Sequence, residues 1–192
     1  IIKTSSNVII INGIGTDVQS RLNGQDLDTD SIYTTNQKNI VELAKKAYNE
    51  CPTIINDIKY GTNKYDKSMK SYSKMDENIS SAQYNIGSAS NIAQLALSYW
   101  FDGGCEDKEL EDVFIICSVL AQVAIDSCKR SFEIKVGAEL ARIEKLPCMK
   151  HDPRYPVFYA DVQKYNNKNK KGRKIEIKES DVGEFNCPMD LL

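Results

Sequence analysis

Two apolar stripes with helical spacing constrain the fold of this chain more than any other feature of its sequence. Along each stripe, apolar residues follow one another at steps of three and four, the period of one face of an α-helix. The first stripe comprises Ile79, Ala82, Ile86, Ala89, Ala93, Leu95, Ala96, Tyr99 and Trp100, and the second comprises Leu110, Val113, Phe114, Cys117, Leu120, Ala121, Ala124 and Cys128. The sequence therefore predicts two long helices.

The ends of these helices are marked by local signals. A possible capping box at Ser80–Gln83 places the start of the first helix near residue 80. Gly103-Gly104 ends it, and the second helix begins near Asp107 and runs past Arg130. Helices joined by so short a connection are expected to pack antiparallel. A continuation from Ile134 to Leu146 belongs either to the second helix or to a third one.

Short strands are predicted in the segment before the helical region. The β-branched run Val8–Ile11 predicts a buried strand, and Ser31–Thr35 predicts a second strand. A helix is expected over 37–49 because its apolar residues share one face. Residues 56–76 are polar and predict a loop.

The composition changes again after Pro147. Val157–Val162 predicts a strand, and the alternation of Lys and Ile over Lys174–Lys178 predicts a half-buried strand. We therefore expect an α+β fold that is mainly α. Its predicted segments are a strand-loop-strand-helix segment (1–52) with an Asp-rich loop, an antiparallel helical pair or bundle (53–146), and a small β-rich, hairpin- and loop-containing segment (147–192).

Composition narrows the possible classes of protein. The chain has 192 residues, 41% of them hydrophobic and 27% charged, which is typical of a globular protein with a core. With a net charge of −2, the chain as a whole has no positive electrostatic potential that would attract nucleic acid. Any nucleic-acid binding must therefore depend on a local cluster of basic residues. The longest apolar run, Val113–Ile125, is too short and polar to span a membrane. The six cysteines form no CxxC pair, and we expect a reduced, cytoplasmic protein.

Three alternating carboxylates form the sharpest chemical motif. Asp26, Asp28 and Asp30 lie within five residues, and in a tight loop their oxygens can converge on one cation. Such hard oxygen ligands suit Mg²⁺ or Ca²⁺. An EF-hand is excluded because its loop needs Gly and Glu where Ser31 and Gln37 stand. A solvated acidic turn that binds no metal is the alternative.

The residues around the triad extend the motif over 8–50. A β-branched run precedes it, and a short predicted strand and a helix follow it. This layout resembles the catalytic loop of the two-barrel (double-psi β-barrel) DxDxD RNA polymerases of phage and mobile-element type. Asp28–Tyr33 also resembles the YGDTDS motif of B-family DNA polymerases, another two-metal site.

The first resemblance implies a nucleotidyltransferase in which Asp26, Asp28 and Asp30 bind Mg²⁺ as catalytic ligands, with nucleic acid and a nucleoside triphosphate as partners. The lysines that neutralise the triphosphate in that superfamily come from a second barrel. This chain, which begins with Ile-Ile and ends with Met189–Leu192, is therefore expected to be part of a longer polypeptide and inactive alone. The alternative is a non-enzymatic helical interaction or scaffold domain.

Two groups of basic residues are candidates for nucleic-acid contact. The first is Lys129 and Arg130 near the end of the second predicted helix, where favourable charge placement is the simpler explanation. The second lies in the basic run 164–178, which is also typical of a solvated hairpin, and comprises Lys170, Lys171, Arg173 and Lys174. The only histidine, His151, is expected to be a surface loop residue, because no Cys or Ser signature accompanies it.

Overall fold

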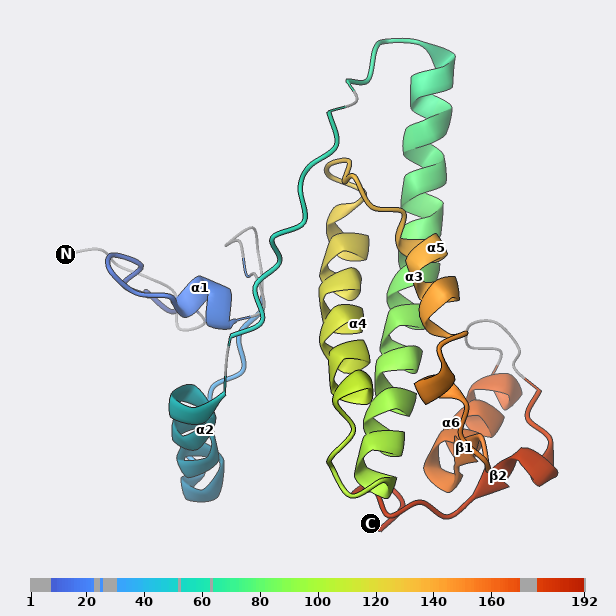
Figure 1. Ribbon diagram of the computed structural model, residues 1–192. Coiled ribbons are helices and arrows are strands. Elements are labelled where there is room, and N and C mark those ends of the chain that lie inside the picture. The colour runs from blue at the N-terminus through green and yellow to red at the C-terminus, as the bar shows by residue number, and fades with distance from the viewer. Residues whose placement is uncertain are drawn as a thin grey trace. The chain divides into compact units, whose positions relative to one another are not determined.

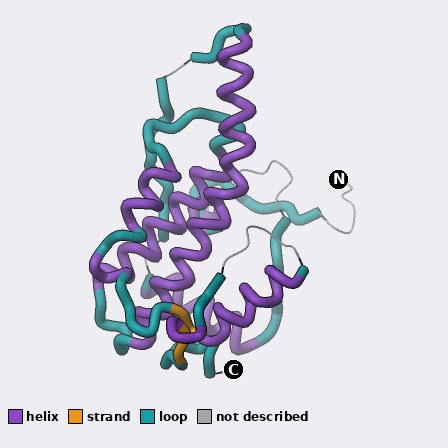
Figure 2. Tube along the Cα trace, turned by 90° about the vertical axis from the view of Figure 1, so that its right-hand side faces the viewer, coloured by secondary structure: helices purple, strands orange, loops and turns teal. Residues whose placement is uncertain are grey.

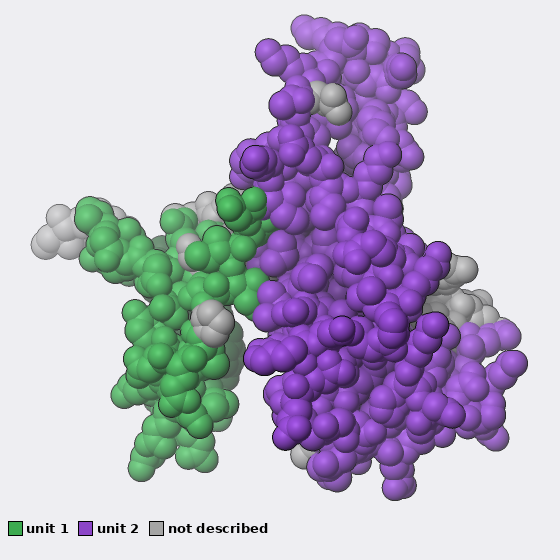
Figure 3. Space-filling view, in the orientation of Figure 1, with its two compact units in different colours: residues 1–57 green, residues 58–192 purple. Residues whose placement is uncertain are grey.

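The computed structural model describes residues 8–22, 25, 31–51, 53–62, 64–169 and 176–191. Two compact units divide the chain, Ile1–Asp57 and Ile58–Leu192 (Figure 3). The prediction of a mainly helical protein is confirmed, because helices make up most of the described chain and strands are confined to one short pair (Figure 2). Within the described residues, no helix is both long enough and apolar enough to cross a membrane.

The first unit contains α1 (Val18–Arg21) and α2 (Lys38–Glu50), and α2 matches the predicted helix closely. The two predicted strands of this unit are wrong, because Val8–Ile11 and Ser31–Thr35 have no regular secondary structure. A β-branched run becomes a strand only when a neighbouring strand accepts and donates its backbone hydrogen bonds. No described residue of the unit provides such a neighbour.

The second unit is built around α3 (Met69–Asp102) and α4 (Lys108–Asp126), which lie side by side and run in opposite directions (Figure 1). Their connection includes two residues in the left-handed region, Gly104 at φ 82° and Cys105 at φ 66°. The side chain of Asp107 then caps α4 by accepting hydrogen bonds from the amides of Glu109 (2.8 Å) and Leu110 (3.3 Å).

The N-terminal end of α3 lies earlier than its apolar stripe indicated, and the predicted loop over 56–76 is wrong from Met69 onward. Local capping explains the difference. The hydroxyl of Ser68 accepts a hydrogen bond from the Ser71 amide (3.2 Å). The carboxylate of Asp66 accepts hydrogen bonds from the Ser68 amide (3.1 Å) and from the hydroxyls of both serines. These bonds start a helix whose first turns are polar and which extends beyond the end of α4 (Figure 1).

Small side chains allow α3 and α4 to approach closely. Ala89 and Ala96 of α3 and Ala124 of α4 have no exposed surface, and the larger core side chains pack around them. Ala121 is half-buried and packs against this core. The main core members are Ile92, Leu95, Tyr99, Leu110, Val113, Cys117, Leu120, Val123, Leu140, Ile143, Met149, Tyr159 and Phe185.

The chain then continues through short elements that pack on the same core. These are α5 (Val136–Ile143), the 3-10 helix η1 (Pro147–Met149), β1 (Tyr155–Pro156), α6 (Val157–Lys168), the 3-10 helix η2 (Glu179–Asp181) and β2 (Val182–Gly183). The continuation after α4 is therefore a separate third helix. β1 and β2 pair in parallel, with Tyr155 opposite Val182 and Pro156 opposite Gly183. A Cβ atom at Gly183 would overlap the ring of Pro153, so this pairing needs glycine there.

The predicted strand Val157–Val162 is wrong, because these residues form the first half of α6. Pro156, at the N-cap position, has no side-chain acceptor, but the carboxylate of Asp190 accepts hydrogen bonds from the amides of Val157 (3.1 Å) and Phe158 (2.8 Å). A distant residue thus caps this helix. The second predicted strand is not formed over 176–178, while Lys174 and Ile175 lie outside the described residues. The predicted segment boundaries after residues 52 and 146 stay predictions.

Candidate functional site

The predicted metal ligands cannot be located in this fold. Asp26, Asp28 and Asp30 lie outside the described residues, and so do Lys170, Lys171, Arg173 and Lys174. Among the described residues, no group of three or more His, Cys, Asp or Glu side chains could hold a metal ion. The magnesium site and the basic loop therefore stay predictions.

Arg130, the best placed of the predicted nucleic-acid contacts, joins two distant parts of the second unit. Its guanidinium donates a hydrogen bond to the Tyr60 hydroxyl (2.7 Å) and lies 4.9 Å from the centre of the Tyr60 ring. The neighbouring Lys129 lies 3.9 Å from the carboxylate of Asp126 at the end of α4. The structure thus places Arg130 beside the segment that precedes α3, and Lys129 at the end of α4.

Backbone hydrogen bonds fix the junction at which residues 59–61 meet residues 131–133. Tyr60 and Phe132 form an isolated antiparallel bridge, and their ring centres are 5.5 Å apart. The Gly61 amide donates to the Ser131 carbonyl (2.9 Å), and the Glu133 amide donates to the Lys59 carbonyl (3.1 Å). A Cβ atom at Gly61 would lie 2.8 Å from the Ser131 hydroxyl oxygen, so the close approach of the two segments favours glycine.

A surface of lysines and tyrosines continues from this junction to the first turns of α3. Tyr60, Tyr65 and Tyr72 are 58%, 38% and 49% exposed. The Tyr65 hydroxyl accepts a hydrogen bond from the Asn78 side chain of α3 (3.0 Å), which holds the preceding segment against the helix. We call this surface the lysine–tyrosine strip; its members, all exposed, are Lys59, Tyr60, Lys64, Tyr65, Lys67, Lys70, Tyr72, Lys74, Lys129 and Arg130.

The charge of the strip differs from that of the chain. Residues 59–75 contain five lysines and one acidic residue, Asp66, whereas the whole chain has a net charge of −2. Hydrogen bonds from Ser68 and Ser71 lower the pKa of Asp66, so this carboxylate is occupied by the cap of α3. Sequence analysis missed the strip because these residues were assigned to a loop, although alternating Lys and Tyr could have indicated it.

The only histidine lies in a loop, as predicted, and its half-buried side chain occupies a second polar cluster. The His151 side chain is 25% exposed and lies between two aromatic rings, with centre-to-centre distances of 4.7 Å to Tyr99 and 4.7 Å to Phe185. Its Nδ1 lies 2.8 Å from the carbonyl oxygen of Pro153, and its Nε2 lies 3.2 Å from the carboxylate of Asp102. Both ring nitrogens are thus engaged within the fold, which favours a structural role over proton transfer to a substrate.

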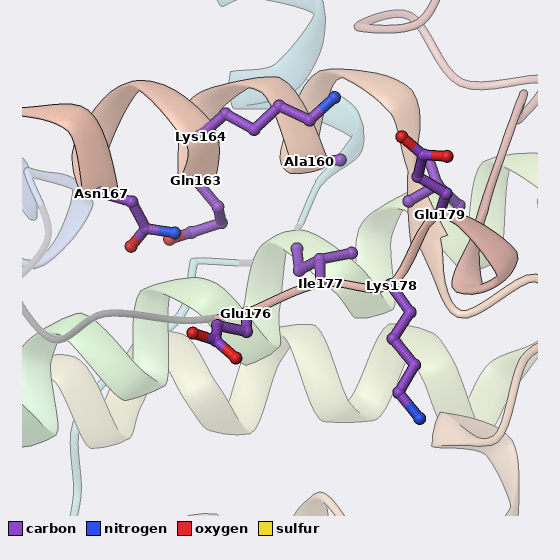
Figure 4. Close-up of a pocket in the computed structure, with 9 residues that line it drawn as sticks. Ala160, Gln163, Lys164, Asn167, Glu176, Ile177, Lys178 and Glu179 are labelled. Atoms are coloured by element: carbon purple, nitrogen blue, oxygen red, sulfur yellow. The ribbon is translucent and has the colours of Figure 1, made fainter.

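A groove lies between α6 and the segment 176–182. Figure 4 shows the amides of Gln163 and Asn167 turned from α6 toward this segment. The groove has a volume of about 880 Å³. Its lining includes Lys164 and Lys178 but also Glu176 and Glu179, so its charge favours neither an anion nor a cation. The residues that line it are Ala160, Gln163, Lys164, Asn167, Glu176, Ile177, Lys178, Glu179 and Val182.

Comparison with protein-family models, curated proteins and solved structures gave no match to this chain. The resemblance of 8–50 to the two-barrel polymerases therefore depends on the Asp26–Asp30 motif and the residues around it. For the described part of the chain, function has to be argued from the geometry of the strip.

Proposed function

We propose that residues 58–192 bind single-stranded nucleic acid along the lysine–tyrosine strip. The observation that carries this proposal is that exposed tyrosines alternate with exposed lysines along the segment that leads into α3 and over the first turns of this helix. Unpaired bases stack on aromatic side chains, and each stacked base contributes about 1–3 kcal/mol. Lysines alongside the rings would neutralise the phosphates that link successive bases.

The contacts beneath the strip support this role. The strip is held at one end by the hydrogen bond between Arg130 and Tyr60, and near its middle by the bond between Tyr65 and Asn78. A surface fixed in this way loses little conformational entropy when a ligand binds. Because stacking needs unpaired bases, we expect weaker binding to a duplex of the same length.

Fluorescence anisotropy with a labelled 20-nucleotide oligothymidylate and a labelled duplex tests the proposal. Contact with about five phosphates predicts a slope of about −3 to −4 when the logarithm of the binding constant is plotted against that of the salt concentration. Replacing Tyr72 by Ala should weaken binding roughly tenfold through the loss of one stacking platform. Tyr84→Ala is the matched control, because Tyr84 is a similarly exposed tyrosine of α3 outside the strip.

Charge reversal gives an independent test of the same surface. The double variant Lys64→Glu and Lys67→Glu should weaken binding by about tenfold or more and reduce the salt dependence. Lys145→Glu with Lys150→Glu changes the net charge equally at exposed positions outside the strip. Absence of binding at low salt, or equal losses in both double variants, would contradict the proposal.

A second candidate function comes from the acidic motif. We propose that Asp26, Asp28 and Asp30 bind Mg²⁺ as part of a nucleotidyltransferase completed by the remainder of a longer polypeptide, with nucleic acid and a nucleoside triphosphate as partners. The alternation of three carboxylates supports this proposal. We also propose a cytoplasmic location for this protein, which the six free cysteine thiols support because the cytoplasm is reducing.

Calorimetric titration with Mg²⁺ and Mn²⁺ tests the metal site. We expect weak binding that disappears in Asp28→Asn, and no nucleotide incorporation by this chain alone. If the wild-type chain and the variant bind both ions equally, the carboxylates form only a solvated turn. Because this readout does not involve the strip, it is independent of the nucleic-acid test.

A further inference from the structure

We infer that two copies of this chain associate through a second face of α4, with the two α4 helices antiparallel across a twofold axis. We call this surface the outer α4 face; its members are Phe114, Ser118, Ala121 and Ile125. Ile125 is 51% exposed, and the other three side chains are half-buried. Val113 and Leu120, which α4 buries in the core, lie about 120° around the helix axis from the centre of this face.

The middle of the helical pair has no charged side chain on any face. Asn78–Phe101 of α3 and Val113–Ile125 of α4 contain no Asp, Glu, Lys or Arg. A helix on the surface of a globular protein normally has a charged face, whereas a helix that is apolar all round is covered on all sides. A partner that covers the outer α4 face therefore removes no charge of this stretch from water, which would be the largest cost of the contact.

The one polar side chain of the outer α4 face already has a partner within its own helix. The hydroxyl of Ser118 donates a hydrogen bond to the carbonyl oxygen of Phe114 (2.9 Å). Ser118 can therefore be buried in a contact between copies without leaving its donor unpaired.

The spacing of the outer α4 face makes it complementary to itself. Its members follow one another at steps of four, three and four, so they lie within roughly 60° of one another around the helix axis. These steps are the same in both directions, so an antiparallel copy places Phe114 opposite Ile125 of the partner subunit and Ser118 opposite Ala121 of the partner subunit. The two small residues then lie at the centre, where they allow close approach, and the two large ones fill the ends.

Opposite charges at the two ends of α4 favour a second copy as the occupant and an antiparallel arrangement of the pair. The segment 106–112, at the N-terminal end, contains five acidic residues and one lysine. The segment 126–130, at the other end, contains one acidic residue and two basic ones. An antiparallel pair brings each acidic end to the basic end of the other copy, whereas a parallel pair brings like charges together.

Sedimentation equilibrium of the full chain, without nucleic acid, tests the inference. One helix face per copy is smaller than a standard interface of about 1,600 Å², so we expect a weak dimer that is half formed at about 10–100 μM. Ile125→Lys places a charge inside the contact and should raise the dissociation constant at least tenfold. Ile116→Lys is the matched control, because Ile116 is an isoleucine of α4 with similar exposure (42%) that lies about 180° around the helix from Ile125.

The control variant should leave the dissociation constant within about twofold of the wild-type value, and circular dichroism at low concentration checks that both variants are folded. A wild-type chain that stays monomeric at the highest concentration of this range would overturn the inference. Equal effects of the two variants, or a dimer that Ile125→Lys does not weaken, would overturn it as well, because another surface would then hold the copies together.

An exchange of charges tests the antiparallel orientation. Glu111 precedes Phe114 by about one turn, and Lys129 follows Ile125 by four residues, so Glu111 and Lys129 of opposite copies meet in the antiparallel pair. Glu111→Lys and Lys129→Glu should each raise the dissociation constant about threefold, and the double variant should restore it. A double variant that dimerises more weakly than either single variant would overturn the antiparallel arrangement.

Discussion

Asp190 offers the sharpest test of how the end of the second unit is held together. Its carboxylate accepts three backbone hydrogen bonds, from the amides of Val157 (3.1 Å), Phe158 (2.8 Å) and Phe185 (3.0 Å). Two of these amides belong to the first turn of α6, where an uncapped helix leaves its donors without partners. Asp190→Ala should therefore destabilise α6 and the segment around Phe185 together.

The expected loss is about 2 kcal/mol of unfolding free energy. Removal of an N-cap acceptor costs about 0.5–2 kcal/mol, and removal of a negative charge at a helix N-terminus costs about 0.3–1 kcal/mol more. A loss of this size lowers the melting temperature by roughly 4–8 °C. Asp190→Asn keeps one acceptor oxygen without the charge, so we expect it to lose about half as much.

Urea unfolding followed by tryptophan fluorescence measures the loss. The only tryptophan, Trp100, lies in α3, so its signal reports on the second unit and not on the first. Asp161→Ala is the matched control, because Asp161 is an exposed aspartate of α6 that forms a surface ion pair with Lys164 (3.6 Å). If Asp190→Ala loses less than about 0.5 kcal/mol, or no more than the control, the capping argument is wrong.

Three further outcomes follow from the core and from the cap of α3. Ala124→Leu should overpack the contact between α3 and α4 and cost about 1–3 kcal/mol in urea unfolding, whereas Ala141→Leu on the exposed face of α5 should cost little. Burial raises the pKa of the Cys117 thiol to about 11, so mass spectrometry after iodoacetamide treatment at pH 8 should find this cysteine unmodified in the folded chain and modified in urea. Because the pKa of Asp66 is lowered in the folded chain, the cap of α3 stabilises the fold at pH values above the ordinary aspartate pKa, and this stabilisation is lost as the pH falls through the lowered pKa. The difference in helical circular-dichroism signal between wild type and Asp66→Asn should therefore shrink over the same pH range. A difference that does not depend on pH would contradict the role of Asp66 as a cap.

Periodicity along the chain was enough to predict the central helices. The apolar stripe of α4 and its cap at Asp107 involve residues a few positions apart, so they can be recognised in the sequence alone. The predicted end of the first helix at Gly103-Gly104 also depends only on neighbouring residues, and it is confirmed because α3 ends at Asp102. The start of α3 was also encoded locally, in Ser68 and Asp66, but its polar turns carry no apolar stripe and so gave no periodic signal.

The strand predictions failed because β-branched and aromatic runs do not specify their own partners. Val157–Val162 has strand-like composition, yet a carboxylate 32 residues from Phe158 caps the segment as a helix. Val8–Ile11 consists of β-branched residues alone, and no described strand pairs with it. Strand propensity measures how well a side chain fits the half-buried surface of a sheet. It therefore does not make a segment a strand unless a neighbouring strand is present.

Tertiary structure alone assembled both polar clusters. Arg130 reaches Tyr60 across 70 residues of sequence, and Asp102 receives the amide of Asn186 across 84 residues. The sequence by itself determined which faces of the helices are apolar, because that property depends on the spacing of residues along one segment. It could not determine which side chains meet, because a hydrogen bond or a stacked pair depends on distances in space that only the packed chain brings below a few ångströms.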